Sequence, residues 1–341
     1  MIALVVSLVT LEAALRLLGT GTPAVPAPST IDPYEPNPYM VSYRPTLQQF
    51  LPGAAFHTER PSYRVRYDIN SLGLRGPEIG PKTKPRLVVL GDSVAEGHGV
   101  EFDQTFVAAL GRSLSADNWE VTNAAIQGAS PIHHAANLER TLALEPDAVV
   151  LVLYENDLRD DRARERDYFT LPARPSEAGL ATWALVENAL APARDAELEQ
   201  NIETNLREAQ GEEIPPVVIS PQSFAVQWGR SQRYLDDIAD RLEEENVRLL
   251  VATLALGTLV PRVPESHHAH ARNLEEAAQA WAESRGLPFL SLYPVTESAL
   301  AELPWEEVML TDDGHPTEEM HRRLGAALTP WLRENLQHRS R

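Results

Sequence analysis

Short apolar runs alternate with stretches of helical periodicity along most of the chain. The first run, Leu87–Leu90, is continuous and ends at Gly91, as expected of a buried parallel strand. Apolar residues at helical spacing predict helices between the runs, the last of them over residues 318–336. Four further strands are predicted, at residues 121–126, 147–154, 247–254 and 287–292. The alternation predicts an α/β fold: a three-layer, flavodoxin-like sandwich with a five-stranded parallel sheet.

The chain begins with a hydrophobic segment, residues 1–19, which is interrupted only by Glu12 and Arg16. Its length approaches the roughly 20 residues that a membrane-spanning helix needs. Glu12 and Arg16 are four residues apart and can pair on one helix face. We interpret the segment as an uncleaved membrane anchor, which would make the rest of the chain extracytoplasmic, either periplasmic or at the cell surface. A cleaved signal-like helix and a buried helix are the alternatives.

Residues 20–84 differ in pattern from the rest of the chain. Proline is frequent over 20–40, which predicts an extended linker. Period-two alternation at Tyr63–Ile69 then predicts a strand, and we expect a small β-rich extension packed on the main domain. The main domain is predicted at 85–337. An insertion at about 158–230, rich in charge and proline, is either a cap over the substrate cleft or a solvated segment.

Composition narrows the range of partners. The formal net charge of −19 argues against nucleic acid, because the field of the protein repels a polyanion. There is no cysteine, which excludes disulfides, a thiolate nucleophile and cysteine-ligated metals. The hydrophobic content of 43% is ample for a core, so the chain is a globular protein with no nucleic-acid partner expected.

Ser93 follows the first predicted strand by two residues. Ligands of open α/β sheets bind just outside the carboxyl ends of the strands, which makes this serine a candidate nucleophile. Asp92 and Ser93 are equally consistent with a turn that caps the next helix. This segment alone does not decide between the two interpretations.

A second candidate segment, Asp312-Asp313-Gly314-His315, lies between the last strand and the last helix. A carboxylate three residues before a histidine, here Asp312, can reach the imidazole in a tight glycine-containing loop and fix its tautomer, and the second ring nitrogen can then take a proton from a serine. Thr317 would cap the following helix, a role that is compatible with catalysis at His315. The segment is therefore a candidate acid–base pair for Ser93.

Two further strand ends carry candidate donors for an oxyanion. Gly128 follows the second strand, and its small size lets its N–H approach a substrate. Asn156 follows the third strand and offers a side-chain amide. Taken singly, each is also typical of an ordinary loop. Four histidines without metal-ligand spacing are interpreted as surface or hydrogen-bonded histidines: His57, His98, His133 and His134.

These segments together resemble the four motif blocks of the SGNH, or GDSL, hydrolases. The matching residues, in order, are Gly91-Asp92-Ser93, Gly128, Glu155-Asn156-Asp157 and Asp312-Asp313-Gly314-His315. The resemblance implies that Ser93 is the nucleophile, His315 the general base and Asp312 the residue that orients it. It also implies an oxyanion hole made by the Ser93 and Gly128 N–H groups and the Asn156 amide.

The chain departs from the family pattern at Glu155, where the third block usually begins with glycine. Asp313 is an alternative to Asp312, although the family spacing favours Asp312. The competing α/β-hydrolase fold has a Gly-x-Ser-x-Gly elbow, and here the second glycine is replaced by Ala95.

The resemblance implies a serine esterase or acylhydrolase that cleaves a small acyl ester through an acyl-enzyme, with no cofactor and no metal. An O-acetyl group on a cell-surface carbohydrate is the expected kind of substrate. Two alternatives use the same residues or the same fold: an O-acyltransferase with a sugar acceptor, and a non-catalytic binding module.

Overall fold

The computed structural model describes residues 26–33, 37–42, 48–158, 221–256 and 265–337. The predicted anchor at 1–19 lies outside these residues, as does most of the predicted insertion at 158–230. Within the described part of the chain, no helix is both long and apolar enough to cross a membrane.

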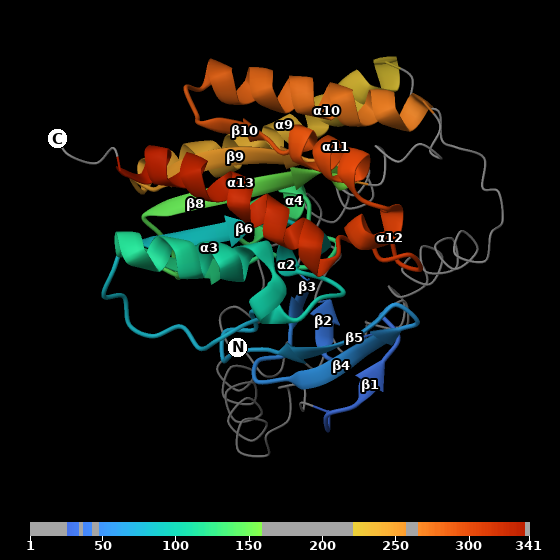
Figure 1. Ribbon diagram of the computed structural model, residues 1–341. Helices are drawn as coiled ribbons and strands as arrows, with labels where there is room; N and C mark the ends of the chain where they lie inside the picture. Colours follow the sequence, from blue (N-terminus) through green and yellow to red (C-terminus); the bar gives the residue numbers. More distant parts are fainter. Residues whose placement is uncertain (1–25, 34–36, 43–47, 159–220, 257–264, 338–341) are drawn as a thin grey trace, which may run out of the picture.

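A five-stranded, wholly parallel sheet forms the centre of the main domain, in the order β10-β9-β8-β6-β7. Chain order places the first strand between the second and third, which is the flavodoxin-like arrangement. The predicted α/β sandwich is therefore confirmed (Figure 1). The strands are β6 (Arg86–Leu90), β7 (Glu120–Asn123), β8 (Ala148–Tyr154), β9 (Arg248–Leu254) and β10 (Phe289–Ser291).

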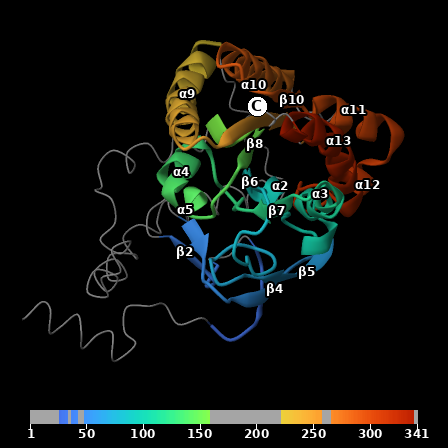
Figure 2. The same ribbon diagram turned by 90° about the vertical axis from the view of Figure 1, so that its left-hand side faces the viewer.

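Helices cover both faces of the sheet because the strand residues alternate in direction. Leu87 and Val89 belong to one apolar cluster, with side chains from α3 and α13, whereas Val88 and Leu90 belong to a second, with side chains from α9 and α10. Figure 2 shows the helices in two groups, one on each face of the sheet. The first group comprises α3 (Phe106–Leu114), α11 (Tyr293–Glu302), α12 (Trp305–Val308) and α13 (Glu318–Gln337). The second comprises α4 (Pro131–Ala136), α5 (Leu138–Leu142), α9 (Pro221–Glu244) and α10 (Glu265–Ser284).

The predicted β-rich extension is present at the N-terminal side of the main domain (Figure 1). Its apolar core stacks Tyr39 on Phe56, with ring centroids 4.5 Å apart, and also contains Ile126, Ala129 and Leu310 of the main domain. The extension therefore packs on loops that follow β7 and precede α13. Its strands are β1 (Thr30–Ile31), β2 (Met40–Ser42), β3 (Gln48–Phe50), β4 (Ala55–Arg60) and β5 (Tyr63–Asp68).

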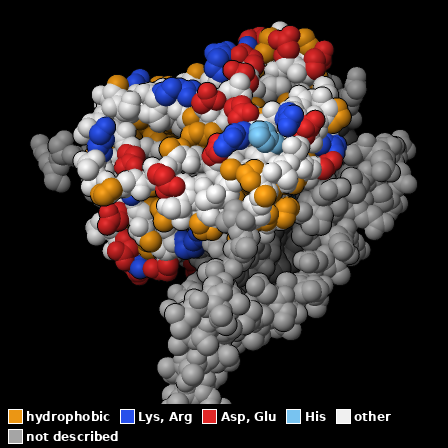
Figure 3. Space-filling model, turned by 90° about the horizontal axis from the view of Figure 1, so that it is seen from below, with side chains coloured by type: hydrophobic (Ala, Val, Ile, Leu, Met, Phe, Trp, Pro, Cys, Tyr) orange, Lys and Arg blue, Asp and Glu red, His pale blue; other side chains and the backbone are white. Residues whose placement is uncertain are grey.

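Acidic and basic side chains are interspersed over the face that is seen from below (Figure 3).

Three short helical turns lie between β6 and β7 along the chain. They are α2 (Ser93–Glu96) and the 3₁₀ turns Phe102–Gln104 and Ser115–Asp117.

Candidate active site

Ser93 begins α2, the single helical turn that follows β6. The chain passes between packed groups at Gly91, where an added Cβ would lie 2.7 Å from the Ala95 Cβ. Only glycine fits this turn. The Asp92 carboxylate accepts the Val94 N–H at 2.9 Å and caps α2. The capping interpretation is therefore correct for Asp92, and it leaves the Ser93 hydroxyl at the carboxyl edge of the sheet.

His315 lies in a tight loop between α12 and α13. The Leu310 N–H donates to the His315 carbonyl at 2.8 Å, and the Gly314 N–H donates to the Leu310 carbonyl at 2.8 Å. This folded loop aims the imidazole at α2, and His315 Nε2 lies 2.8 Å from Ser93 Oγ. Two residues that are 222 positions apart in sequence are thus within hydrogen-bond distance.

The carboxylate that contacts His315 is Asp313, and this corrects the predicted pairing with Asp312. Asp313 Oδ1 accepts a hydrogen bond from His315 Nδ1, and the Asp313 side chain is fully buried. The Asp312 carboxylate instead binds the Ser62 hydroxyl at the edge of the extension. Spacing along the sequence suggested Asp312, but the Leu310–Gly314 turn directs the side chain of residue 313 toward the imidazole.

Two residues that the sequence did not identify surround Asp313. The Tyr63 hydroxyl donates to Asp313 Oδ2 at 2.7 Å, and His98 Nε2 lies 3.1 Å from the same oxygen. The rings of His98 and His315 are 4.3 Å apart between centroids. The interpretation of His98 as a hydrogen-bonded histidine holds, but its place beside Asp313 had no signal in the sequence other than its nearness to Ser93.

The electrostatics of this cluster favour an ionised Asp313 and a basic His315. Burial by itself would raise the pKa of the Asp313 carboxyl, but the imidazoles of His315 and His98 outweigh burial and hold that pKa well below its usual range. Burial lowers the pKa of His315, and the Asp313 carboxylate outweighs it, so the net pKa is raised above the ordinary histidine value. Asp92 and Glu96 add to this rise.

His98 responds in the opposite direction. Burial and the nearby His315 ring lower its pKa, and they outweigh the attraction of Asp313. His98 is therefore neutral when His315 carries a proton, which removes the repulsion that two adjacent imidazolium ions would feel. A neutral His98 with its proton on Nε2 is a donor to Asp313.

The loop after β7, which contains Gly128, is fastened to the serine turn. The Ile126 N–H donates to the Gly91 carbonyl at 3.2 Å, and the Gln127 N–H donates to Glu96 Oε2 at 2.6 Å. Glu96 is fully buried, and burial raises its pKa to about 7. Gly128 itself has a φ of +66°, which favours glycine. These contacts fix the backbone beside Ser93.

Asn156 lies in the turn that follows β8. Its neighbour Asp157 accepts the Tyr154 N–H at 3.1 Å and shapes this turn. The side-chain oxygen of Asn156 is buried and has no hydrogen-bond partner in the described part of the chain. Ser93, Gly128 and Asn156 thus follow three neighbouring parallel strands, β6, β7 and β8, and share the carboxyl edge of the sheet.

The described residues include one set of side chains with the spacing of metal ligands. The ligand atoms of His98, Asp313 and His315 lie within 4.8 Å of one another. The same atoms are joined to one another, or to Ser93, by the hydrogen bonds described above, so these contacts do not require an ion.

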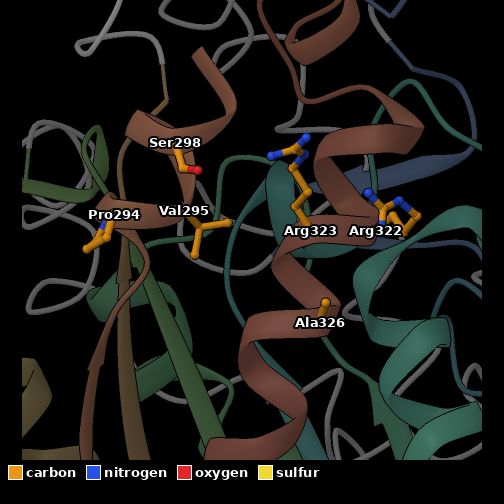
Figure 4. Close-up of a pocket in the computed structure, with 6 residues that line it drawn as sticks. All are labelled: Pro294, Val295, Ser298, Arg322, Arg323 and Ala326. Atoms are coloured by element: carbon orange, nitrogen blue, oxygen red, sulfur yellow. The ribbon is translucent and has the colours of Figure 1, made fainter. Parts of the chain in front are cut away.

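A separate surface groove lies between α11 and α13 (Figure 4). Its lining residues do not belong to the Ser93 cluster, which consists of Ser93, His315, Asp313, His98 and Tyr63. Arg323 pairs with Glu302 at 2.9 Å, and both Arg322 and Arg323 pair with Glu319. The charges of the groove are thus matched locally. Its lining residues are Pro294, Val295, Ser298, Arg322, Arg323 and Ala326.

Comparison with known proteins gives a family match and several structural likenesses. A family model described as GDSL-like lipase/acylhydrolase matches residues 89–323. None of the curated proteins matches the chain. The crystal structure of TesA is 18% identical, with a TM-score of 0.44 over 73% of this chain and 98% of its own. A catalytic mutant of Axe2, an acetylxylan esterase from Geobacillus stearothermophilus, is 14% identical, with a TM-score of 0.46 over 77% of this chain and 99% of its own.

Proposed function

The chain belongs to the GDSL-like lipase/acylhydrolase family and is an SGNH-type hydrolase, and we propose that it cleaves small acyl esters through an acyl-enzyme formed on Ser93. The observation that carries the proposal is the 2.8 Å contact between Ser93 Oγ and His315 Nε2. A serine hydroxyl is a weak nucleophile at neutral pH, and an adjacent imidazole that accepts its proton activates it.

In the acylation step, Ser93 Oγ attacks the ester carbonyl carbon while His315 Nε2 takes the hydroxyl proton. The tetrahedral intermediate collapses, the bond to the alcohol oxygen breaks, and the imidazolium returns the proton to that oxygen. Water then attacks the acyl-enzyme with His315 again acting as the base. The carboxylic acid leaves and Ser93 is restored.

Asp313 is the carboxylate that serves His315 in this scheme. Its bond to His315 Nδ1 leaves Nε2 as the unprotonated nitrogen that faces Ser93. Its negative charge also stabilises the imidazolium that forms during acylation. The N–H groups of Ser93 and Gly128 and the amide of Asn156 are the proposed donors to the oxyanion, because they share the carboxyl edge of the sheet.

For the substrate, we propose an O-acetyl ester on a cell-surface carbohydrate, by analogy with the family alone. The proposed location is extracytoplasmic, with the hydrophobic segment 1–19 as an anchor. These two proposals are independent of the mechanism, since any small acyl ester tests the reaction.

Hydrolysis of p-nitrophenyl acetate by the wild type and by Ser93→Ala tests the proposed function. Removal of the nucleophile should lower kcat by roughly a thousandfold or more, because the acyl-enzyme no longer forms. Ser71→Ala is the matched control, since Ser71 bonds to Glu78 on the surface of the extension. Wild-type turnover that persists in Ser93→Ala would contradict the proposal.

A fluorophosphonate probe and product analysis separate the remaining alternatives. The probe should label the wild type at Ser93, and a protein that neither reacts with it nor hydrolyses esters would be a binding module instead. Acyl groups found on an added polysaccharide, in place of free acid, would identify an acyltransferase.

A further inference from the structure

The hairpin between β4 and β5 contacts both carboxylates of the loop that carries His315. The Ser62 hydroxyl binds Asp312 Oδ1, and Arg60 Nη2 donates to the Asp312 carbonyl at 3.3 Å. Arg60 Nε also lies 3.7 Å from the Asp312 carboxylate. Asp312 is therefore held by the hairpin, turned away from the imidazole of His315.

The next residue of the hairpin, Tyr63, contacts the other carboxylate. Its hydroxyl lies 2.7 Å from Asp313 Oδ2 and 2.9 Å from His98 Nε2. His98 Nε2 is in turn 3.1 Å from Asp313 Oδ2, so three polar groups form a closed, buried triangle. Asp313 Oδ1 is left for His315.

We propose that Tyr63 and His98 are positioning residues that hold Asp313 against His315, and that the hairpin thereby determines which of two adjacent carboxylates orients the general base. This inference rests on the proposed function of Ser93 and His315. Tyr63 and His98 act through Asp313 and do not contact the reacting atoms.

Tyr63 and His98 act together on the same oxygen of Asp313. Two donors on Oδ2 prevent the carboxylate from rotating, so that Oδ1 keeps its contact with His315. They also solvate a charge that is fully buried and would otherwise lose its water without compensation. The neutral His98 ring, 4.3 Å from His315, does so without adding a second positive charge.

The test substitutes Tyr63→Phe, which removes one hydroxyl and keeps the ring. We expect kcat for p-nitrophenyl acetate to fall roughly tenfold to hundredfold, with KM within about twofold, because a hydrogen bond to a charged group is lost and substrate contacts are not. Tyr39→Phe is the matched control. Its buried hydroxyl bonds to Ser29 and Ala27 within the same extension and touches no group of the Ser93 cluster.

The pH profile provides a readout that a merely structural role would not change. Loss of the Tyr63 donor lets the Asp313 carboxylate rotate away from His315, which weakens the contact that raises the His315 pKa and therefore lowers that pKa. The acid limb of kcat/KM should therefore move to lower pH in Tyr63→Phe and stay in place in Tyr39→Phe. The titratable groups that interact with His315 are Asp92, Glu96, His98, Asp313 and His321, and all of them are unchanged in both variants.

Titration of the His315 imidazole by NMR, on the full chain and with His315→Gln for assignment, separates this inference from the proposed function. If no variant and no wild type hydrolyses esters, a lowered His315 pKa in Tyr63→Phe would still support the positioning role. If the wild type is active and Tyr63→Phe matches Tyr39→Phe in kcat, acid limb and His315 titration, the inference is wrong.

Discussion

Asp312 and Asp313 are adjacent, yet the structure gives them different surroundings. Asp313 is buried against His315, whereas Asp312 binds the hairpin of the extension. The sequence favoured Asp312 because its spacing matches the family motif. The choice depends on contacts with Ser62 and Tyr63, which are 250 positions away in the chain, and no local pattern reports such contacts.

Because only Asp313 of these two carboxylates contacts His315, we expect different effects on activity from the matched variants Asp313→Asn and Asp312→Asn. Asp313→Asn should lower kcat/KM by roughly a thousandfold or more, since the amide favours the wrong imidazole tautomer. The acid limb should also move to lower pH, because the carboxylate that raises the His315 pKa is gone. Asp312→Asn keeps the imidazole contact and should retain most of the activity. Steady-state kinetics across pH measures both.

Equal losses of activity in the two variants would contradict the assignment of Asp313. A larger loss in Asp312→Asn would support Asp312, the residue that the family spacing favours, as the partner of His315. The roles of Ser93 and His315 do not depend on this result, because their contact is direct.

At the scale of elements, the strands with continuous apolar runs were predicted closely. β6 and β8 lie within one residue of their predicted bounds, since a strand buried on both faces has no polar positions to confuse its pattern. β7 ends at Asn123, three residues before its predicted end. The Ala124 N–H still donates to Val89 of β6, but the Ala125 N–H donates to the Asn123 side chain and the Ile126 N–H donates to Gly91, beyond the end of β6. α9 begins at Pro221, inside the predicted insertion.

The connection between α2 and the loop after β7 predicts a further effect on catalysis. Glu96→Ala leaves the partly buried Gln127 N–H without its acceptor, which loosens the backbone beside Gly128. We expect kcat to fall about tenfold, because Gly128, the proposed oxyanion donor, is less well placed. Glu96→Gln keeps an acceptor oxygen and should remain closer to the wild type. Activity equal to the wild type in Glu96→Ala would show that Gly128 needs no such support.

At the scale of the whole molecule, the extension and the main domain meet at Arg75. This buried guanidinium stacks on the Tyr67 ring at 3.8 Å and donates to the Val100 carbonyl at 2.6 Å. It also donates to the carbonyl of Gly97, the C-cap of α2. One side chain thus links the strands of the extension to the turn that carries Ser93.

Arg75→Ala should lower the free energy of unfolding by about 3 kcal/mol, because it removes several charge-assisted hydrogen bonds and leaves buried carbonyls unpaired. Denaturant titration measures the change. Arg66→Ala is the control: Arg66 is exposed and pairs with Asp68, so its loss should leave stability nearly unchanged. Similar midpoints for Arg75→Ala and the wild type would show that the extension contributes little to the main domain.

The β4–β5 hairpin, which contacts both Asp312 and Asp313, also determines the smallest fragment of the chain that keeps the complete site. A fragment cut at the start of β6 keeps the sheet, the serine and the imidazole, and it satisfies every motif of its family. Such a fragment lacks the tyrosine that holds the acid and exposes Ile126, Ala129 and Leu310, the apolar residues that the extension covers. For this protein, a boundary drawn from family motifs would remove part of the catalytic apparatus.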